Sequence, residues 1–407
     1  MSTQTLRQRF SFSSTQKKVL LALASMVGLR MLGLFLVLPV FTLYGLQFTS
    51  SKFLVGFAFG AYALTMAILQ IPLGRLSDRI GRRKVLVLGM TLFSVGSILC
   101  ALPLLFPRPW QIWELIIGRL VQGGGAIISV AFATVADYIE PERRSTAMAV
   151  LGIPIGLSFA VGIIGGPILA GWFGTAFLFW LTGLLGLGTD FLLVRYLKDE
   201  RLQRAVPAPL GQVFAHPALI AYAGGGFLIN FFMTTFFFYF PLIVRDQHHL
   251  KMTDYYKLLL PMMLISAVTM FGFSQGADKG WARPLASLAY LMFIPSFLLL
   301  FEPAWLGQNP QRLVPVFLAG TLFYIGFTGL EPILPSLVSK ASPGSSYGTA
   351  LGFYNTAQFI GSTVGGSVAG AFANYPPSRT LFTMLIAATI GFLTMLATKP
   401  PARPETT

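Results

Sequence analysis

Long apolar runs, separated by short polar segments, occupy almost the whole of this sequence. A helix needs about 20 apolar residues to cross the hydrocarbon core of a bilayer, and most of these runs reach that length. They do not alternate apolar and polar residues, so a transmembrane β-barrel is not expected. Only 11% of the 407 residues are charged, whereas soluble globular proteins carry about 25%. The sequence therefore predicts an all-α membrane protein.

Twelve of the runs are candidate transmembrane helices, in two sets of six. The first set comprises 19–46, 52–74, 85–106, 110–137, 145–172 and 173–194. The second set comprises 216–243, 255–275, 284–301, 312–338, 347–372 and 378–398. The connection between the sets, 195–215, is charged and then proline-containing, which is typical of a linker. We therefore expect a six-helix bundle over 1–194, a cytosolic linker, and a second six-helix bundle over 216–407.

The basic residues indicate how the chain is oriented in the membrane. With the N-terminus inside, twenty of the 29 Lys and Arg residues fall on the cytoplasmic side and seven on the outside. Such an excess marks cytoplasmic loops, so we expect both termini in the cytoplasm. The net charge of +15 is spread over short clusters, which argues against nucleic acid as a partner.

Several features recur in both halves at an offset of about 200 residues. They are the pair Asp78 and Asp278, the pair Gly81 and Gly280, and the Gly-Gly pairs at 165–166 and 365–366. Recurrence at one offset indicates duplication, and hence two pseudo-symmetric bundles. Duplicated six-helix halves are typical of transporters, whose substrate path lies where the halves meet.

Three motifs, in order along the chain, resemble those of the major facilitator superfamily. Residues 74–84 read GRLSDRIGRRK and are similar to its signature loop between helices 2 and 3. Residues 119–125 read RLVQGGG and are similar to its helix-4 motif, R-x-x-Q-G-x-G. Residues 162–171 read GIIGGPILAG and resemble the helix-5 motif of its drug–proton antiporters, although Ala170 stands where Gly is usual.

Two further stretches, 29–45 and 334–366, are similar to the YajR-type branch of this superfamily. The resemblance implies proton-coupled export of small molecules by alternating access, with the proton gradient as the driving force and no cofactor. It implies a transporter in a bacterial inner membrane and not an enzyme. The namesake of that branch carries an additional C-terminal cytosolic domain. The last predicted helix ends about ten residues before the end of this sequence, so we do not expect such a domain here.

The loop between helices 2 and 3 is expected to form a conformational latch. Its members would be Gly74, Asp78, Gly81, Arg82, Arg83 and Asp137. Asp78 can accept hydrogen bonds from the N-terminus of a neighbouring helix, expected to be helix 11, because the helix dipole favours an anion there. Arg82 or Arg83 would bridge to Asp137 at the cytosolic end of helix 4. The alternative is a basic loop that only orients the protein.

The other two motifs supply candidate packing and sealing residues. In helix 4 they are Arg119, Gln122, Gly123 and Gly125, and in helix 5 they are Gly162, Gly166, Pro167 and Gly171. Small residues permit close contact between helices in lipid, and a proline removes one backbone hydrogen bond. In the resembled family the helix-5 segment seals the outer half of the path. The alternative is ordinary packing of small residues.

Ionisable residues within a membrane span are costly and are therefore functional candidates. Arg30, Arg119 and Glu331 lie deep in predicted spans, and we expect Glu331 to carry the proton with one of the arginines modulating it. The alternative is a static salt bridge between Glu331 and an arginine. Asp190 is expected at the interface, paired with Arg195, and Glu114 is expected to reach water at the outer end of helix 4.

Two other functions remain open on these residues. Two cations against one acid could suit an organic anion, and a non-transporting membrane receptor or assembly protein could use the same fold. Polar residues within the spans could line a substrate path or form interhelical hydrogen bonds. They are Gln70, Gln122, Asn230, Tyr324, Asn355 and Gln358.

The expected partners are a small-molecule substrate, protons and the lipid bilayer, and the protein is expected to be a monomer. No metal site is expected, because adjacent His248 and His249 do not face one another usefully and Cys100 is the single cysteine. The sequence carries no G-x-x-x-x-G-K-[ST] loop, so ATP is not expected to drive it.

Overall fold

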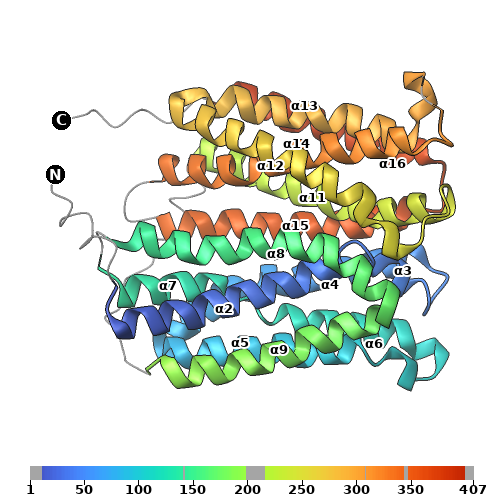
Figure 1. Ribbon diagram of the computed structural model, residues 1–407. Coiled ribbons are helices and arrows are strands. Elements are labelled where there is room, and N and C mark those ends of the chain that lie inside the picture. Colours follow the sequence, from blue (N-terminus) through green and yellow to red (C-terminus); the bar gives the residue numbers. More distant parts are fainter. Residues whose placement is uncertain (1–11, 141–142, 199–215, 308, 343–346, 399–407) are drawn as a thin grey trace. The chain divides into compact units, whose positions relative to one another are not determined.

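The computed structural model describes residues 12–140, 143–198, 216–307, 309–342 and 347–398. Within these ranges every regular element is a helix (Figure 1). Each of the twelve predicted runs overlaps at least one helix. The prediction of an all-α membrane protein is therefore confirmed. Most of the expected linker at 195–215 lies outside the described residues.

The helices group by their contacts into two compact units. The first contains residues 1–44 and 68–205, and the second contains 45–67 and 206–407. Residues 45–67 join the second unit because the first part of α4 (Lys52–Ile80) packs on α15 (Tyr347–Phe372). Thr363 donates a hydrogen bond from Oγ1 to the Gly60 carbonyl oxygen at 3.1 Å. The division into bundles over 1–194 and 216–407 stays a prediction.

The first unit is built around the long helix α2. Its elements are α2 (Ser14–Val37), α3 (Phe41–Gly45), the second part of α4, α5 (Arg82–Cys100), α6 (Arg108–Gly123), α7 (Ile128–Tyr138), α8 (Arg144–Phe173) and α9 (Thr175–Tyr196). Helix α2 packs on α8 and α9, and α5 packs on α6 and α9 (Figure 1). These contacts bury the faces that carry the helix-4 and helix-5 motifs.

The predicted helix over 110–137 is interrupted. Helix α6 ends at Gly123 and α7 begins at Ile128. Three consecutive glycines at this point lower the helix propensity, and Ile127 donates its backbone N–H to the Gly125 carbonyl oxygen at 2.8 Å. A Cβ at Gly125 would lie 2.9 Å from the Phe93 Cβ, so glycine also permits the close approach to α5.

The second unit contains the remaining helices. They are α11 (Pro217–Asp246), α12 (Tyr256–Gly276), α13 (Ala282–Phe301), α14 (Leu313–Ala341), α15 and α16 (Pro377–Ala397). Helix α11 packs on α15, and α13 packs on α14 and α16. Aromatic rings fill the space among α11, α13 and α14, and the rings of Phe236 and Phe323 stack with centroids 4.0 Å apart. The phenylalanines of α11 between Phe231 and Phe240 are therefore core residues and do not face lipid.

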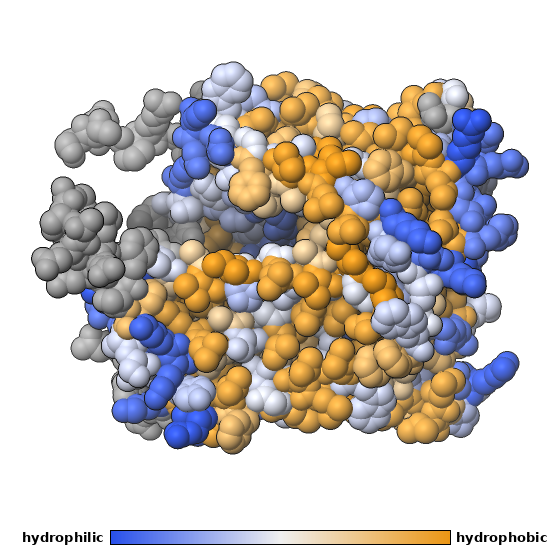
Figure 2. Space-filling model, viewed as in Figure 1, coloured by the Kyte–Doolittle hydropathy of each residue, from blue (hydrophilic) through white to orange (hydrophobic). Residues whose placement is uncertain are grey.

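The helices are long and apolar enough to cross a membrane. Among the described residues, ten helical segments are long and apolar enough to span a membrane, and one of them, Met252–Phe301, contains both α12 and α13. Hydrophobic side chains cover the middle of the helices and hydrophilic ones gather at the helix ends (Figure 2). Large apolar side chains such as Ile153, Val268 and Ile386 are exposed within the spans, as expected of residues that face lipid.

The two units repeat one helix–helix contact. In the first unit, Gly162 and Gly166 of α8 lie against the α2 backbone, and a Cβ at Gly162 would lie 2.6 Å from the Phe35 Cβ. In the second unit, Gly361 and Gly365 of α15 lie against the α11 backbone in the same way. These glycines are 199 residues apart in sequence, so the contact repeats one residue away from the offset of 200 seen in the Gly-Gly pairs.

The chain has a glycine with positive φ before α5 and before α13. Gly81 has a φ of 103° and a ψ of 145°, whereas Gly280 has a φ of 98° and a ψ of 4°. Positive φ of this size is rarely adopted by residues with a Cβ. The two glycines, which correspond loosely in the sequence, therefore share a positive φ but not the same turn conformation.

Candidate functional site

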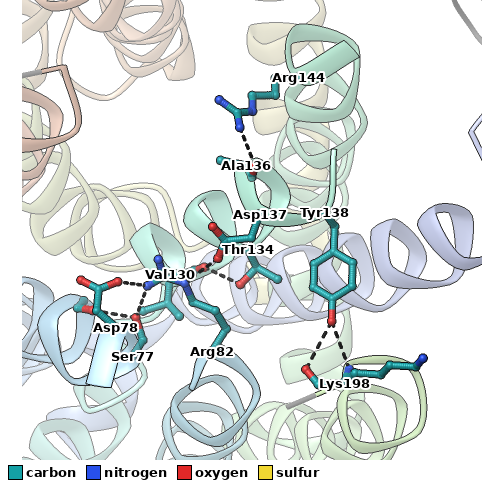
Figure 3. Close-up of polar contacts among 11 residues, drawn as sticks. Ser77, Asp78, Arg82, Val130, Thr134, Ala136, Asp137, Tyr138, Arg144 and Lys198 are labelled. Carbon is teal, nitrogen blue, oxygen red and sulfur yellow. Dashed lines mark hydrogen bonds and ion pairs between the residues drawn. The ribbon is translucent and has the colours of Figure 1, made fainter. Parts of the chain in front are cut away.

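Arg82 is the centre of the loop between α4 and α5. Its Nη1 lies 2.5 Å from Asp78 Oδ1 and its Nε lies 2.9 Å from Asp137 Oδ2 (Figure 3). Nη1 also donates to Ser77 Oγ at 2.5 Å. The turn at Gly81 brings this side chain, from the first residue of α5, between the end of α4 and the end of α7. One guanidinium thus binds carboxylates from two helices, as its several fixed donors permit.

Other members of the expected latch are placed differently. Arg82, and not Arg83, forms the ion pair with Asp137. A Cβ at Gly74 would meet only Ser129 Oγ, at 4.0 Å, so the described residues leave room for a side chain there. The expected contact between Asp78 of the first unit and the start of helix 11, in the second unit, stays a prediction.

The C-terminal end of α7 makes further contacts. Tyr138 donates from its hydroxyl to the Lys198 carbonyl oxygen at 3.3 Å, and the Lys198 backbone N–H donates to that hydroxyl at 3.2 Å (Figure 3). Arg144 donates from Nη2 to the Ala136 carbonyl oxygen at 2.7 Å. The end of α7 is therefore held by the start of α5, the start of α8 and the residues after α9.

The helix-4 motif forms a buried chain of hydrogen bonds. Arg119 donates from Nη1 to Gln122 Oε1 at 2.6 Å, and Gln122 donates from Nε2 to Ser97 Oγ at 2.8 Å. Arg119 and Gln122 are 2% and 1% exposed. The Arg119 guanidinium also lies over the Phe41 ring, 5.0 Å from its centroid. Gln122, a candidate for the substrate path, thus joins α6 to α5.

The helix-5 motif has two kinds of glycine. Gly162 and Gly166 contact the backbone of α2, and no side chain fits at either position. Gly171 is exposed near the end of α8. Pro167 lies buried inside the continuous helix α8. Only part of the motif is therefore used for the α2–α8 contact.

The expected proton-coupling residues are divided between the two units. Arg30 and Arg119 belong to the first unit, and Arg30 is 1% exposed. Glu331 lies in α14 of the second unit and is half-buried. Within the described part of the second unit, no Lys or Arg forms an ion pair with it. Tyr354 of α15, which is 1% exposed, lies within electrostatic range of the Glu331 carboxylate.

The other path candidates also separate by unit. Gln70 of α4 is 2% exposed, and neither amide atom has a hydrogen-bond partner among the described residues. Asn230 of α11 accepts from Ser362 Oγ at 3.3 Å and so contacts α15. Gln358 lies beside Gly226 of the same helix pair. Tyr324 is fully buried among aromatic rings, whereas Asn355 is half-buried.

Sequence reasoning misplaced two acids. Glu114 does not reach water: it is 7% exposed, because α6 begins at Arg108 and packs on α5. The spacing does carry a signal, since Glu114 precedes the buried Gln122 by eight residues and so lies on the same helix face. Asp190 accepts a hydrogen bond from Thr91 Oγ1 at 2.9 Å, so its partner is a hydroxyl on α5 and not the expected Arg195.

No group of three or more His, Cys, Asp and Glu side chains that could hold a metal ion occurs in the part of the chain that the structure describes. His248 lies in the turn after α11, where partial burial lowers the pKa of its imidazole. The adjacent His249 lowers it further.

Comparisons with known proteins agree with the motifs. The family model described as Major Facilitator Superfamily matches residues 23–366. The chain is 32% identical over 372 residues to the inner membrane transport protein YajR of Escherichia coli (strain K12), covering 89% of this chain and 78% of that protein. It is 26% identical over 329 residues to multidrug resistance protein 3 of Bacillus subtilis (strain 168), covering 79% of this chain and 54% of that protein.

The fold is also that of solved transporters. The crystal structure of a D-xylose-proton symporter has a TM-score of 0.74 at 18% sequence identity, covering 93% of this chain and 96% of that one. At this identity the likeness shows the fold alone. Two six-helix halves, as the sequence predicts, are the architecture of such proteins.

Proposed function

Because the chain belongs to the major facilitator superfamily and is a multi-pass membrane transporter and not an enzyme, we propose that it exports small molecules in exchange for protons by alternating access. The multidrug resistance protein among its relatives supports export. We also propose that the protein acts as a monomer in a bacterial inner membrane, with both termini in the cytoplasm, and that the proton gradient is its energy source.

Glu331 carries this proposal. It is an acid in the membrane-spanning part of α14, half-buried and without an ion-pair partner among the described residues of its own unit. Ionisable groups at such a depth are costly and mark proton or substrate sites. A carboxyl group there binds a proton when it is desolvated and releases it when a cation or water approaches. Alternating access would change the solvation of the Glu331 carboxyl group in each transport cycle.

The ion pairs of Arg82 support the conformational part of the proposal, which is alternating access. Arg82 joins the ends of α4 and α7 through Asp78 and Asp137. These side chains are 18% to 32% exposed, so their ion pairs are accessible to water and of modest strength. A contact of this kind can break and re-form during a transport cycle, which a latch requires.

Proteoliposomes test the proton assignment. The organic cation ethidium, added as a probe across a pH gradient, should change the luminal pH for the wild type and for the control Glu302→Gln. Glu331→Gln should lose the pH change while its Tm stays that of the wild type. An unchanged pH response in Glu331→Gln would contradict the role of Glu331.

A second candidate function is transport of an organic anion. Arg30 and Arg119 are both almost fully buried in the first unit, where two cationic side chains could attract an anionic substrate. Fluorescein as the probe distinguishes the two functions. An anion carrier should move fluorescein and ignore ethidium, and Arg30→Ala should abolish fluorescein transport. An exporter of cations should show the opposite preference.

A further inference from the structure

Glu114 is a buried acid in the first unit that the proposed function does not use. It lies in the second turn of α6 and is 7% exposed. Neither carboxylate oxygen has a hydrogen-bond partner among the described residues. The described residues around this side chain therefore supply no hydrogen-bond donor that would stabilise a negative charge.

The titratable groups that face Glu114 come from three helices. Tyr44 of α3 and Cys100 of α5 both lie within electrostatic range of its carboxyl group. The Tyr44 hydroxyl donates its proton to the Cys100 carbonyl oxygen at 2.8 Å and not to Glu114. The Cys100 thiol points to the Leu115 carbonyl oxygen at 3.9 Å.

Arg119 is the cation on the same helix. The Cys100 thiol lies within electrostatic range of both Arg119 and Glu114. Arg119 directs Nη1 to Gln122 and places its guanidinium on the Phe41 ring. The Glu114 carboxylate oxygens accept no hydrogen bond from the described residues.

A carboxyl group in such a place is more stable with a proton than with a charge, because desolvation disfavours the ionised form and no bonded donor offsets it. We propose that Glu114 is a proton-binding site in the first unit, distinct from Glu331 in the second unit. The chain then carries one membrane-embedded acid in the fourth predicted helix of each half. If Glu331 also binds a proton, these two acids together hold two protons.

Infrared spectroscopy of the purified protein in lipid nanodiscs tests the proposal without any substrate. The C=O stretching band of a protonated carboxylic acid should be present at neutral pH in the wild type and in Glu331→Gln. Glu114→Gln should remove this band in the Glu331→Gln background. The matched control Asp246→Asn, which replaces an exposed carboxylate paired with Arg245, should leave it unchanged.

The outcome is independent of transport, so failure of the Glu331 assignment and failure of this one are separable. A band that Glu114→Gln leaves intact in the Glu331→Gln background would overturn the proposal. If Glu114→Gln does not fold, Glu114→Met fills a similar volume without a proton and serves in the same comparison.

The pH dependence of the Tm of the wild type is a second test. Its Tm should fall as the pH rises, because unfolding releases the Glu114 proton, and Glu114→Gln or Glu114→Met should reduce this slope. An unchanged slope would also overturn the proposal.

Discussion

The Nε of Arg82 lies 2.9 Å from Asp137 Oδ2 and thereby joins the first turn of α5 to the last turn of α7. We expect Arg82→Ala and Asp137→Asn to lower the free energy of unfolding by amounts that are not additive. The coupling should be about 1 kcal/mol, as for partly exposed ion pairs. Thermal unfolding of the two single variants and the double variant measures it. Arg83→Ala is the matched control, and coupling of equal size between Arg83 and Asp137 would contradict the assignment.

Gly166 should tolerate no side chain. A Cβ there would overlap the Leu36 carbonyl of α2, whereas a Cβ at the adjacent Gly165 would lie 3.9 Å from the nearest atom, Leu36 Cδ2. Gly166→Ala should therefore destabilise the protein by about 1–3 kcal/mol through overpacking. Gly165→Ala should be neutral or slightly stabilising, because alanine is the better helix former. Equal Tm values for the two variants would show that α2 and α8 do not pack as closely as described.

Gly81 should resist substitution for a different reason. Its φ of 103° is unfavourable for any residue with a Cβ. Gly81→Ala should lower the stability by about 1–3 kcal/mol, the usual strain at such positions. Gly280→Ala should do the same in the second unit, where φ is 98°. Gly74→Ala, seven residues before Gly81 and inside α4, is the control. A neutral Gly81→Ala would mean that the turn has another conformation.

Arg119 should not be replaceable by lysine. Lysine keeps the charge but loses the planar group that lies on Phe41 and the fixed donor to Gln122. We expect Arg119→Lys to cost about 1.5–3 kcal/mol, the range for hydrogen bonds to charged groups, in chemical or thermal unfolding. Arg312→Lys, at an exposed position before α14, should have no effect. Equal stability of both variants would argue against the buried network.

The apolar runs predicted the helices well, because crossing a bilayer imposes length and composition on each segment directly. The break between α6 and α7 was not predicted, since the apolar pattern continues through the glycines and only the fit against Phe93 of α5 requires them. The choice of Arg82 over Arg83 depends on the direction in which the turn at Gly81 points each side chain. A linear sequence does not contain that direction.

The burial of Glu114 was also missed, because depth in a span was counted from an assumed helix start and not from the packing of α6 on α5. The sequence predicted that the two halves repeat, but the offset between the repeated helix contacts differs by one residue from the predicted offset. The Gly-Gly pairs suggest an offset of 200, whereas the glycines that contact α2 and α11 are 199 apart. Which glycine touches a neighbouring helix depends on the rotation of each helix, and both Gly residues of a pair satisfy the composition equally.

We propose that Glu331 couples transport to protons. To test this coupling, uphill movement of a transported probe, driven by a pH gradient, is compared with exchange of the same probe at equal pH on both sides. We expect Glu331→Gln to retain exchange and lose uphill movement, while Glu302→Gln retains both. Uphill movement by Glu331→Gln at the wild-type rate would contradict the claim.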